Sequence, residues 1–247
     1  MDRKHTKPPP SKVAVRSSEC WSLSTQMSAT PSQCWRYRLC TRSRSAHHAC
    51  AKHGRVSHSH IAGYKAVMLA ADKYQRFVPM LMTAAGTVKA ARVVILGVGV
   101  AGLQAIATAK RLGAVIEATD VRPSVKEQVE SLGAKFIDVP FETDEEKEAA
   151  EGVGGYARPM PASWLDRQKV EVAKRVALAD LVITTALIPG RAAPVLVSEE
   201  MVKAMKPGSV IIDIAAGKGP DGVGGNCPLT EAGKTVIKHG VTLVGET

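Results

Sequence analysis

The sequence predicts an α/β fold with a doubly wound parallel sheet. Short apolar runs bounded by glycine recur from residue 92 onward, and stretches with helical periodicity separate them. Strands that are apolar on both faces are typical of a parallel sheet covered by helices on both sides. The 247 residues are 45% hydrophobic, which allows a complete core, and no apolar run reaches the roughly 20 residues of a membrane-spanning helix.

Six strands and four helices are expected in order along the body of the chain. The predicted strands are residues 92–96, 115–119, 136–139, 181–185, 210–214 and 241–245, and the predicted helices are residues 62–82, 101–112, 124–132 and 164–179. β-Branched residues dominate the first strand, Gly113 ends the second helix, and Ser124 and Glu127 have capping-box spacing in the third. Right-handed crossovers then produce the spatial strand order 3-2-1-4-5-6.

The charge is distributed unevenly between the first quarter of the chain and the rest. Residues 1–60 hold 11 Lys and Arg against 2 Asp and Glu, a net charge of +9, whereas residues 61–247 hold 22 against 21, a net charge of +1. The total of +10 suggests nucleic acid as a partner, but the near-neutral body removes that suggestion for residues 61–247. No nucleic-acid partner is therefore expected for the body.

Three interpretations of the basic leader stay open: a disordered segment that is not native to the protein, a mitochondrial transit peptide, and a nucleic-acid-binding tail. The leader is rich in Ser, Arg, His and Pro and has no apolar period. A transit peptide would share this composition but would also be amphipathic, which the leader is not. Its four cysteines are 14, 6 and 10 residues apart, so none forms the close pair that structural zinc sites use.

A glycine motif directly follows the first predicted strand and opens a helix. It reads Gly97-Val98-Gly99-Val100-Ala101-Gly102, which is G-x-G-x-x-G in the context that dinucleotide binding requires. The first glycine allows a tight turn, the second lets the backbone approach a pyrophosphate, and the third permits close packing. The free N–H groups at the helix start attract phosphate.

An acidic residue at the end of the second strand strengthens this prediction. Asp120 lies 18 residues after Gly102, where a carboxylate can accept hydrogen bonds from both adenosine ribose hydroxyls and repel the 2′-phosphate of NADP. Arg122 weakens the preference for NAD, because an arginine at that place can accommodate the 2′-phosphate. We therefore expect a disordered leader over residues 1–60, a connecting helical segment over residues 61–91, and an NAD-binding Rossmann domain over residues 92–247.

Longer stretches of the sequence resemble one family closely. They are residues 97–114, Ala118-Thr-Asp-Val-Arg122, Thr184-Thr-Ala-Leu-Ile-Pro-Gly190 and Gly225-Asn-Cys-Pro-Leu229. The family is the α subunit of proton-translocating NAD(P)+ transhydrogenase, in its soluble NAD(H)-binding domain, and the resemblance covers roughly residues 61–244. It implies NAD(H) bound here and NADP(H) on a partner domain, with direct hydride transfer coupled to proton movement through a membrane domain.

The resemblance also implies individual cofactor contacts. Val100 would meet the cofactor from the glycine turn, and Asp120, Val121 and Arg122 would hold the adenosine ribose. Gly155 and Tyr156 resemble the family's mobile loop, which Met160 also joins. Gln168 would be a further contact, and Ala186 and Leu187 would lie beside the nicotinamide half. No catalytic side chain and no metal ligand is implied, because the domain mainly positions the nicotinamide for hydride transfer.

The chain departs from the family at both ends. The family places Arg, Gln, Asp and Ser side chains of a first lobe just before the segment that begins at Ile61, and residues 55–60 hold none of them in register. The segment that normally follows Thr247 is also missing, so we expect a truncated member with an intact cofactor lobe. The resemblance further implies a homodimer located at the cytoplasmic face of a bacterial inner membrane, or alternatively at the mitochondrial matrix side.

Two alternative functions stay open. Alanine dehydrogenase shares the fold but uses an acidic residue four positions after the Asp that ends the fifth strand; here that Asp is Asp213 and the fourth position is Gly217, which cannot ionise. A non-catalytic NAD-binding remnant would bind NADH without transferring hydride. Cys227 is expected to be a buried, inert thiol rather than a nucleophile.

Overall fold

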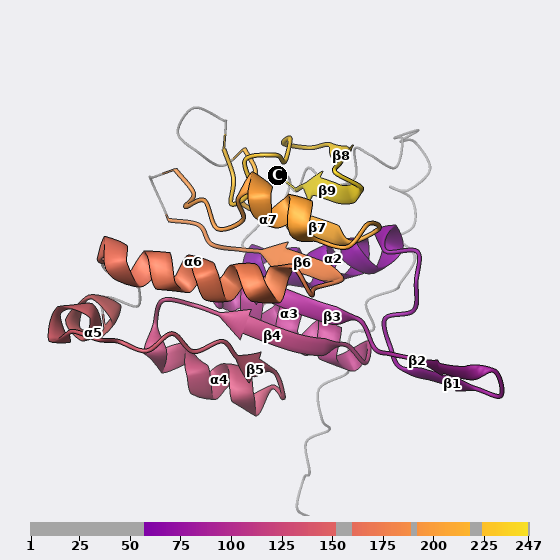
Figure 1. The fold of residues 1–247 in the computed structure, drawn as a ribbon, viewed down its shortest axis with the longest axis horizontal. Helices are drawn as coiled ribbons and strands as arrows, with labels where there is room; N and C mark the ends of the chain where they lie inside the picture. The colour runs from indigo at the N-terminus through magenta and orange to yellow at the C-terminus, as the bar shows by residue number, and fades with distance from the viewer. Residues whose placement is uncertain (1–56, 152–159, 189–191, 218–223, 247) are drawn as a thin grey trace, which may run out of the picture. The chain divides into compact units, whose positions relative to one another are not determined.

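The computed structural model describes residues 57–151, 160–188, 192–217 and 224–246, which belong to one unit spanning residues 56–247 (Figure 1). Its main sheet has seven strands in the order β5-β4-β3-β6-β7-β9-β8. The strands are β3 (Arg92–Leu96), β4 (Val115–Thr119), β5 (Lys135–Phe136), β6 (Leu181–Thr184), β7 (Val210–Asp213), β8 (Thr235–Lys238) and β9 (Val241–Gly245). Six are parallel, and β8 pairs antiparallel with β9. The predicted doubly wound fold and the order of its six strands are confirmed.

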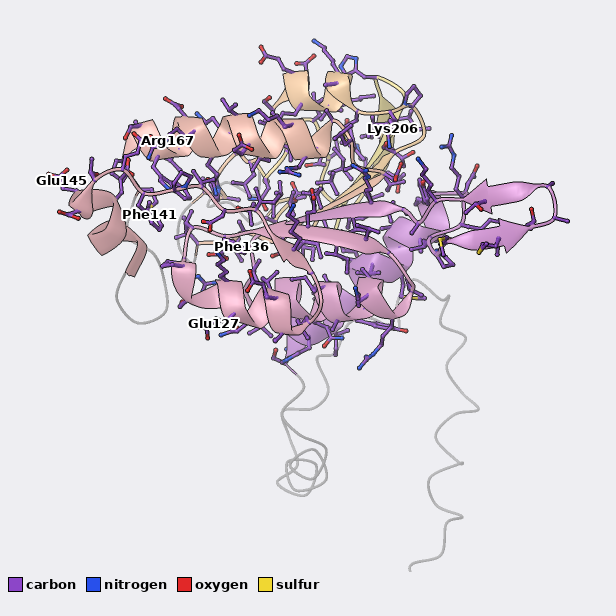
Figure 2. The ribbon with its side chains drawn as sticks, turned by 60° about the horizontal axis from the view of Figure 1, so that its bottom comes forward. Glu127, Phe136, Phe141, Glu145, Arg167 and Lys206 are labelled. Carbon is purple, nitrogen blue, oxygen red and sulfur yellow. The ribbon has the colours of Figure 1, made fainter. Side chains whose placement is uncertain are left out.

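Both faces of the sheet are buried. In β3, Val93 and Ile95 join the core beneath α2 (His58–Lys73) and α3 (Val100–Arg111), whereas Val94 and Leu96 join the core beneath α6 (Ala162–Val176) and α7 (Glu199–Ala204). Figure 2 shows α6, with Arg167, and α4 (Lys126–Ser131), with Glu127, on opposite sides of the sheet. Two-sided burial explains the near-continuous apolar runs in the sequence.

The helix α2 packs closely against α3 through a glycine. A Cβ atom on Gly63 would lie 2.1 Å from the carbonyl oxygen of Ala101, far closer than carbon and oxygen can approach. Ala66, Val67 and Ala70 bury the same face of α2. The absent side chain of Gly63 therefore lets α2 contact the first turn of α3, directly behind the glycine motif.

The predicted helix over residues 62–82 is wrong beyond Lys73. Gln75 adopts a φ of +40° and Pro79 follows, and the chain then forms a two-stranded hairpin of β1 (Leu81–Thr83) and β2 (Gly86–Val88). A left-handed residue and a proline both interrupt the helical backbone, although the apolar spacing continues past them.

The strand β8, the short helix α7 and the 3-10 turn η1 (Pro123–Val125) were not predicted. A two-residue turn joins β8 to β9, and its residues His239 and Gly240 both have positive φ, as a type I′ hairpin requires. The acidic run expected as a solvated helix face or linker forms α5 (Asp144–Glu151). One of its carboxylates is nevertheless fully buried.

Candidate dinucleotide-binding site

The chain direction across the sheet reverses between β3 and β6. The chain passes from β3 to β4 and β5 on one side, and then from β6 to β7 and β9 on the other, which places a crevice at the carboxyl ends of β3 and β6. There the Thr185 hydroxyl donates a hydrogen bond of 2.8 Å to the Gly97 carbonyl. Gly97 has a φ of +95°, and a Cβ atom on it would lie 3.0 Å from the amide nitrogen of Ala186. The structure therefore brings the glycine turn and the predicted Ala186 together.

The start of α3 leaves its first amide groups without a side-chain cap. Gly99 is the N-cap residue, and a Cβ atom on it would meet nothing within 4 Å. In contrast, a Cβ atom on Gly102 would lie 2.1 Å from the Gly97 carbonyl oxygen. Val100 is exposed and Ala101 is half-buried. Uncapped N–H groups beside open space fit a phosphate group, so the local geometry suits a dinucleotide.

Asp120 is tied to the glycine turn. Its Oδ2 accepts a hydrogen bond of 2.7 Å from the Val98 amide, and its Oδ1 accepts one of 2.9 Å from the Arg122 amide. The Arg122 guanidinium adds bonds of 3.0 Å through Nε and 3.1 Å through Nη2. These four donors occupy the accepting positions of the carboxylate. A ribose hydroxyl would therefore replace or share a donor of Arg122.

The remaining predicted contacts are distributed differently. Gln168 is buried on α6, on the same helix face as Trp164, whereas Leu187 is exposed just after β6. Val121 is half-buried in the turn between Asp120 and Arg122. Gly155 and Tyr156 lie outside the described residues. The roles of all these residues in cofactor binding stay predictions.

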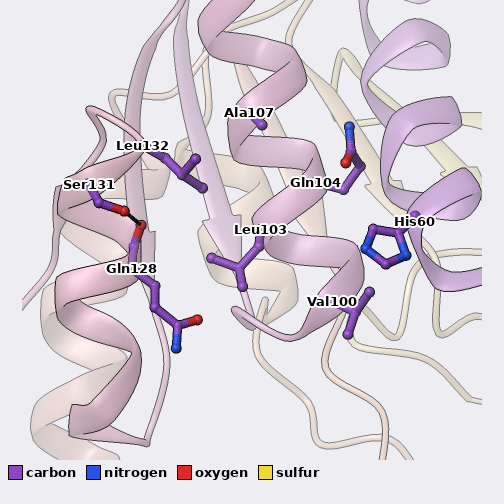
Figure 3. Close-up of a pocket in the computed structure, with 8 residues that line it drawn as sticks. All are labelled: His60, Val100, Leu103, Gln104, Ala107, Gln128, Ser131 and Leu132. Atoms are coloured by element: carbon purple, nitrogen blue, oxygen red, sulfur yellow. Dashed lines mark hydrogen bonds between the residues drawn. The ribbon is translucent and has the colours of Figure 1, made fainter. Parts of the chain in front are cut away.

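A shallow depression of about 370 Å³ lies over α3, between the start of α2 and α4 (Figure 3). Val100, Leu103 and Leu132 give it an apolar lining, and Gln104 and Gln128 add amide groups. Of the predicted cofactor contacts, only Val100 lines it. We do not place the dinucleotide here, because the uncapped amide groups and Asp120 lie at the sheet edge.

A second cluster at the sheet edge was not predicted from the sequence. Asp213, at the end of β7, is fully buried and accepts four hydrogen bonds of 2.9–3.1 Å. The donors are the hydroxyls of Thr184 and Thr230 and the amides of Ala215 and Cys227. Asn226, next to Cys227, is also fully buried. No sequence motif pointed to these residues, although Asp213 does end a strand at the binding edge.

The thiol within this cluster is inert, as expected. Cys227 is buried, and burial raises the pKa of its thiol above the ordinary value. Since the thiolate is the reactive form, both effects oppose nucleophilic chemistry.

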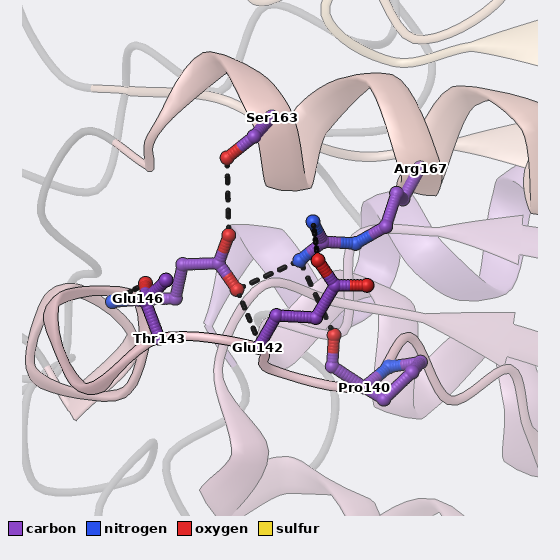
Figure 4. A network of polar contacts seen from close by, with 6 residues as sticks. All are labelled: Pro140, Glu142, Thr143, Glu146, Ser163 and Arg167. Carbon is purple, nitrogen blue, oxygen red and sulfur yellow. Dashed lines mark hydrogen bonds and ion pairs between the residues drawn. The ribbon is translucent and has the colours of Figure 1, made fainter.

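A buried carboxylate also joins α5 to α6 (Figure 4). Glu146 accepts hydrogen bonds from the Glu142 amide at 2.8 Å, from Arg167 Nη2 at 2.7 Å and from the Ser163 hydroxyl at 3.1 Å. The Glu142 amide holds the pKa of the Glu146 carboxyl below its ordinary value, Ser163 and Arg167 act in the same direction, and burial opposes them. Beside this network, Phe141 stacks on Trp164 with ring centroids 5.9 Å apart.

Comparison with known proteins identifies the family. Residues 66–247 match the family described as alanine dehydrogenase/PNT, C-terminal domain. The chain belongs to this family. It is 59% identical over 191 residues to an NAD(P) transhydrogenase subunit alpha of Rhodospirillum rubrum, covering 77% of this chain and 48% of that protein. The transhydrogenase structure from Sinorhizobium meliloti matches with a TM-score of 0.63 and 51% identity, covering 76% of this chain and 47% of that one.

Within the alanine dehydrogenase/PNT family, this chain is more similar to these two transhydrogenases than to the alanine dehydrogenases that it matches. Alanine dehydrogenase of Staphylococcus epidermidis is 33% identical over 186 residues, covering 74% of this chain and 43% of that protein. A solved L-alanine dehydrogenase structure matches with a TM-score of 0.54 and 27% identity, covering 76% of this chain and 46% of that one. The sequence resemblance to transhydrogenase is thus confirmed, and the chain spans about half the length of the curated relatives it matches.

Two further findings bear on this family member. In the described ranges, no helix is both long and apolar enough to cross a bilayer. The same ranges contain no group of three or more His, Cys, Asp and Glu side chains that could hold a metal ion.

Proposed function

We propose that this chain is the NAD(H)-binding component of a proton-translocating NAD(P)+ transhydrogenase. The uncapped start of α3, with open space beside Gly99 and Asp120 held against Val98, carries the proposal. The 59% identity to a transhydrogenase subunit favours this function over alanine dehydrogenase, and so does Gly217, which offers no carboxylate after Asp213.

The chain's own residues divide the binding task. The amide groups of Val100, Ala101 and Gly102 would bind the pyrophosphate, and Asp120 and Arg122 would hold the adenosine ribose. Ala186 and Leu187 would orient the nicotinamide half, with Gln168, Gly155 and Tyr156 as further contacts. Bound NADH would supply the hydride for NADP+ on a partner domain. The protein then contributes mainly proximity and orientation, and we assign no acid, base or metal in this chain.

The proposal is tested by titrating the full chain with NADH and NADPH while nucleotide fluorescence is followed. We expect saturable NADH binding and weaker NADPH binding, because Asp120 repels a 2′-phosphate. A folded chain that does not bind NADH contradicts the proposal. Mixing the NADH-loaded chain with an NADP-binding domain then measures hydride transfer. Binding without transfer would favour the alternative, a non-catalytic NAD-binding module.

We also propose that the chain works as a homodimer, together with an NADP-binding domain and a membrane domain at the cytoplasmic face of a bacterial inner membrane, or at the mitochondrial matrix side. Exposed apolar side chains are concentrated on α2 and the hairpin: Ile61, Tyr64, Met68, Phe77, Met80, Met82 and Val88. Such an apolar concentration supports an association surface. Light scattering should report a dimer that Met82→Lys weakens and Ile237→Lys, at a separate exposed strand, leaves intact.

A further inference from the structure

Asn226 holds the segment that follows β6 by both its side chain and its backbone. Its Nδ2 donates hydrogen bonds of 2.9 Å to the Ala186 carbonyl and 2.8 Å to the Pro194 carbonyl. Its own carbonyl accepts bonds from the amides of Leu196 at 2.9 Å and Val197 at 3.1 Å. One fully buried residue thus makes four hydrogen bonds to the chain between Ala186 and Val197.

The side-chain amide of Asn226 can take only one orientation. Both carbonyls need a donor, so rotating the amide by half a turn would place its oxygen against the oxygens of Ala186 and Pro194. In the observed orientation Oδ1 is buried and has no hydrogen-bond partner. Leaving a buried acceptor unpaired is unfavourable. The benefit of Asn226 therefore lies in its two donors, which neither aspartate nor an apolar residue could replace.

The backbone around Asn226 is fixed from the other side by Asp213. The Cys227 amide and the Thr184 hydroxyl donate to the two oxygens of Asp213 at 3.1 and 3.0 Å. A Cβ atom on Gly225 would lie 2.4 Å from the Asp213 carboxylate, so the loop passes too closely for a side chain. The bonds form a closed path from the end of β6 through Asp213 and Asn226 and back to Ala186.

We propose that Asn226 is a positioning residue for the part of the crevice formed by Ala186 and Leu187. The inference rests on the proposed function, which places the nicotinamide half beside these two residues. Asn226 acts by fixing the Ala186 carbonyl and does not touch the cofactor. The adenosine half lies beside Asp120, at the end of β4, and makes no use of Asn226.

The test compares NADH with ADP-ribose, which lacks the nicotinamide, on the full chain. We expect Asn226→Ala to weaken NADH binding at least tenfold and to change ADP-ribose binding less than twofold. Thr230→Val is the matched control: it removes hydroxyl bonds to Asp213 and the Cys227 carbonyl without touching the segment after β6. This control should lower the melting temperature and leave the ratio of the two affinities unchanged.

Three outcomes would overturn the inference. An unchanged affinity ratio in Asn226→Ala, or a parallel loss of both ligands, would show that Asn226 only supports the fold. If Asn226→Ala does not fold, amide hydrogen exchange on the wild-type chain decides: the Leu196 and Val197 amides should exchange as slowly as those of β6, and fast exchange contradicts the clamp. A folded wild-type chain that binds neither ligand would overturn the proposed function itself, and the inference with it.

Discussion

The two halves of the binding edge are built in different ways. Beside β3 and β4, three glycines shape the turn and Asp120 closes it through the Val98 amide. Beside β6 and β7, Asn226 reaches Ala186 across 40 residues of sequence, and Asp213 reaches Thr184 across 29. The first half depends on backbone space that only glycine leaves free, whereas the second depends on polar side chains that meet because the loops are folded.

The largest effect is expected in the glycine turn. Gly102→Ala places a methyl group 2.1 Å from the Gly97 carbonyl, and such overpacking costs typically about 1–3 kcal/mol, so both the melting temperature and NADH affinity should fall. Gly99→Ala is the paired variant. Its methyl group meets no protein atom within 4 Å, so the melting temperature should stay unchanged while NADH binding weakens by about tenfold or more, equivalent to about 1.4 kcal/mol. Unchanged NADH affinity in Gly99→Ala would contradict phosphate binding at this turn.

Sequence alone predicted the first half well because its geometry leaves a local pattern. The spacing of Gly97, Gly99 and Gly102 follows from a strand, a turn and a helix in immediate succession, and Asp120 is located by the end of the next strand. The six-strand order followed from the same alternation of apolar runs and helices.

The second half could not be predicted in the same way. Asn226 and Thr230 are ordinary loop residues whose partners depend on how loops far apart in sequence pack together. The hairpin of β1 and β2 was missed for a related reason: helical spacing of apolar residues continues beyond Lys73, but Gln75 and Pro79 end the helix. Gly63 gave no signal either, because the helix it contacts lies elsewhere in the sequence.

The second-largest effect is expected at Asp213. In Asp213→Asn the new NH₂ group faces one backbone amide, of Ala215 or Cys227, which cannot rotate away as a hydroxyl can. A buried donor left unpaired costs about 1–3 kcal/mol, which corresponds to a fall in melting temperature of roughly 2–4 °C per kcal/mol. Asp138→Asn is the control, since Asp138 is exposed and pairs only at the surface with Lys126. Equal melting temperatures for both variants would contradict the importance of the Asp213 network.

The third prediction contrasts Asp213 with Glu146, a buried carboxylate that is paired with a cation. Because the folded-state pKa of Glu146 lies below its ordinary value of 4.5, its contribution to stability is present above that pH and is lost as the pH falls through the folded pKa. Thermal unfolding measured between pH 3 and pH 7 should therefore show a smaller acid-induced loss in Glu146→Gln than in wild type. Glu145→Gln removes an exposed charge from the same helix and should keep the wild-type pH dependence. Identical profiles for Glu146→Gln and wild type would refute the prediction.

The smallest effect concerns selectivity in the adenosine half. Arg122 donates to Asp120 through Nε and Nη2 and to the Val98 carbonyl at 3.1 Å, so a cation stands beside the carboxylate that should repel NADP. Arg122→Met removes that cation and leaves Asp120 bound to the Val98 amide. A partly exposed ion pair contributes on the order of 0.5–1 kcal/mol, so the preference for NADH over NADPH should rise about two- to fivefold.

The control for this small change is Lys126→Met, which removes a nearby cation that pairs with Asp138 instead. Both variants lose one positive charge, so a general electrostatic effect on the phosphates would change their NADPH affinities equally. A change in the NADH/NADPH ratio confined to Arg122→Met would assign it to the pair with Asp120. If the ratio falls instead, Arg122 holds Asp120 in the orientation that binds ribose. The selectivity of this half would then depend on the same kind of side-chain positioning as the half beside β6.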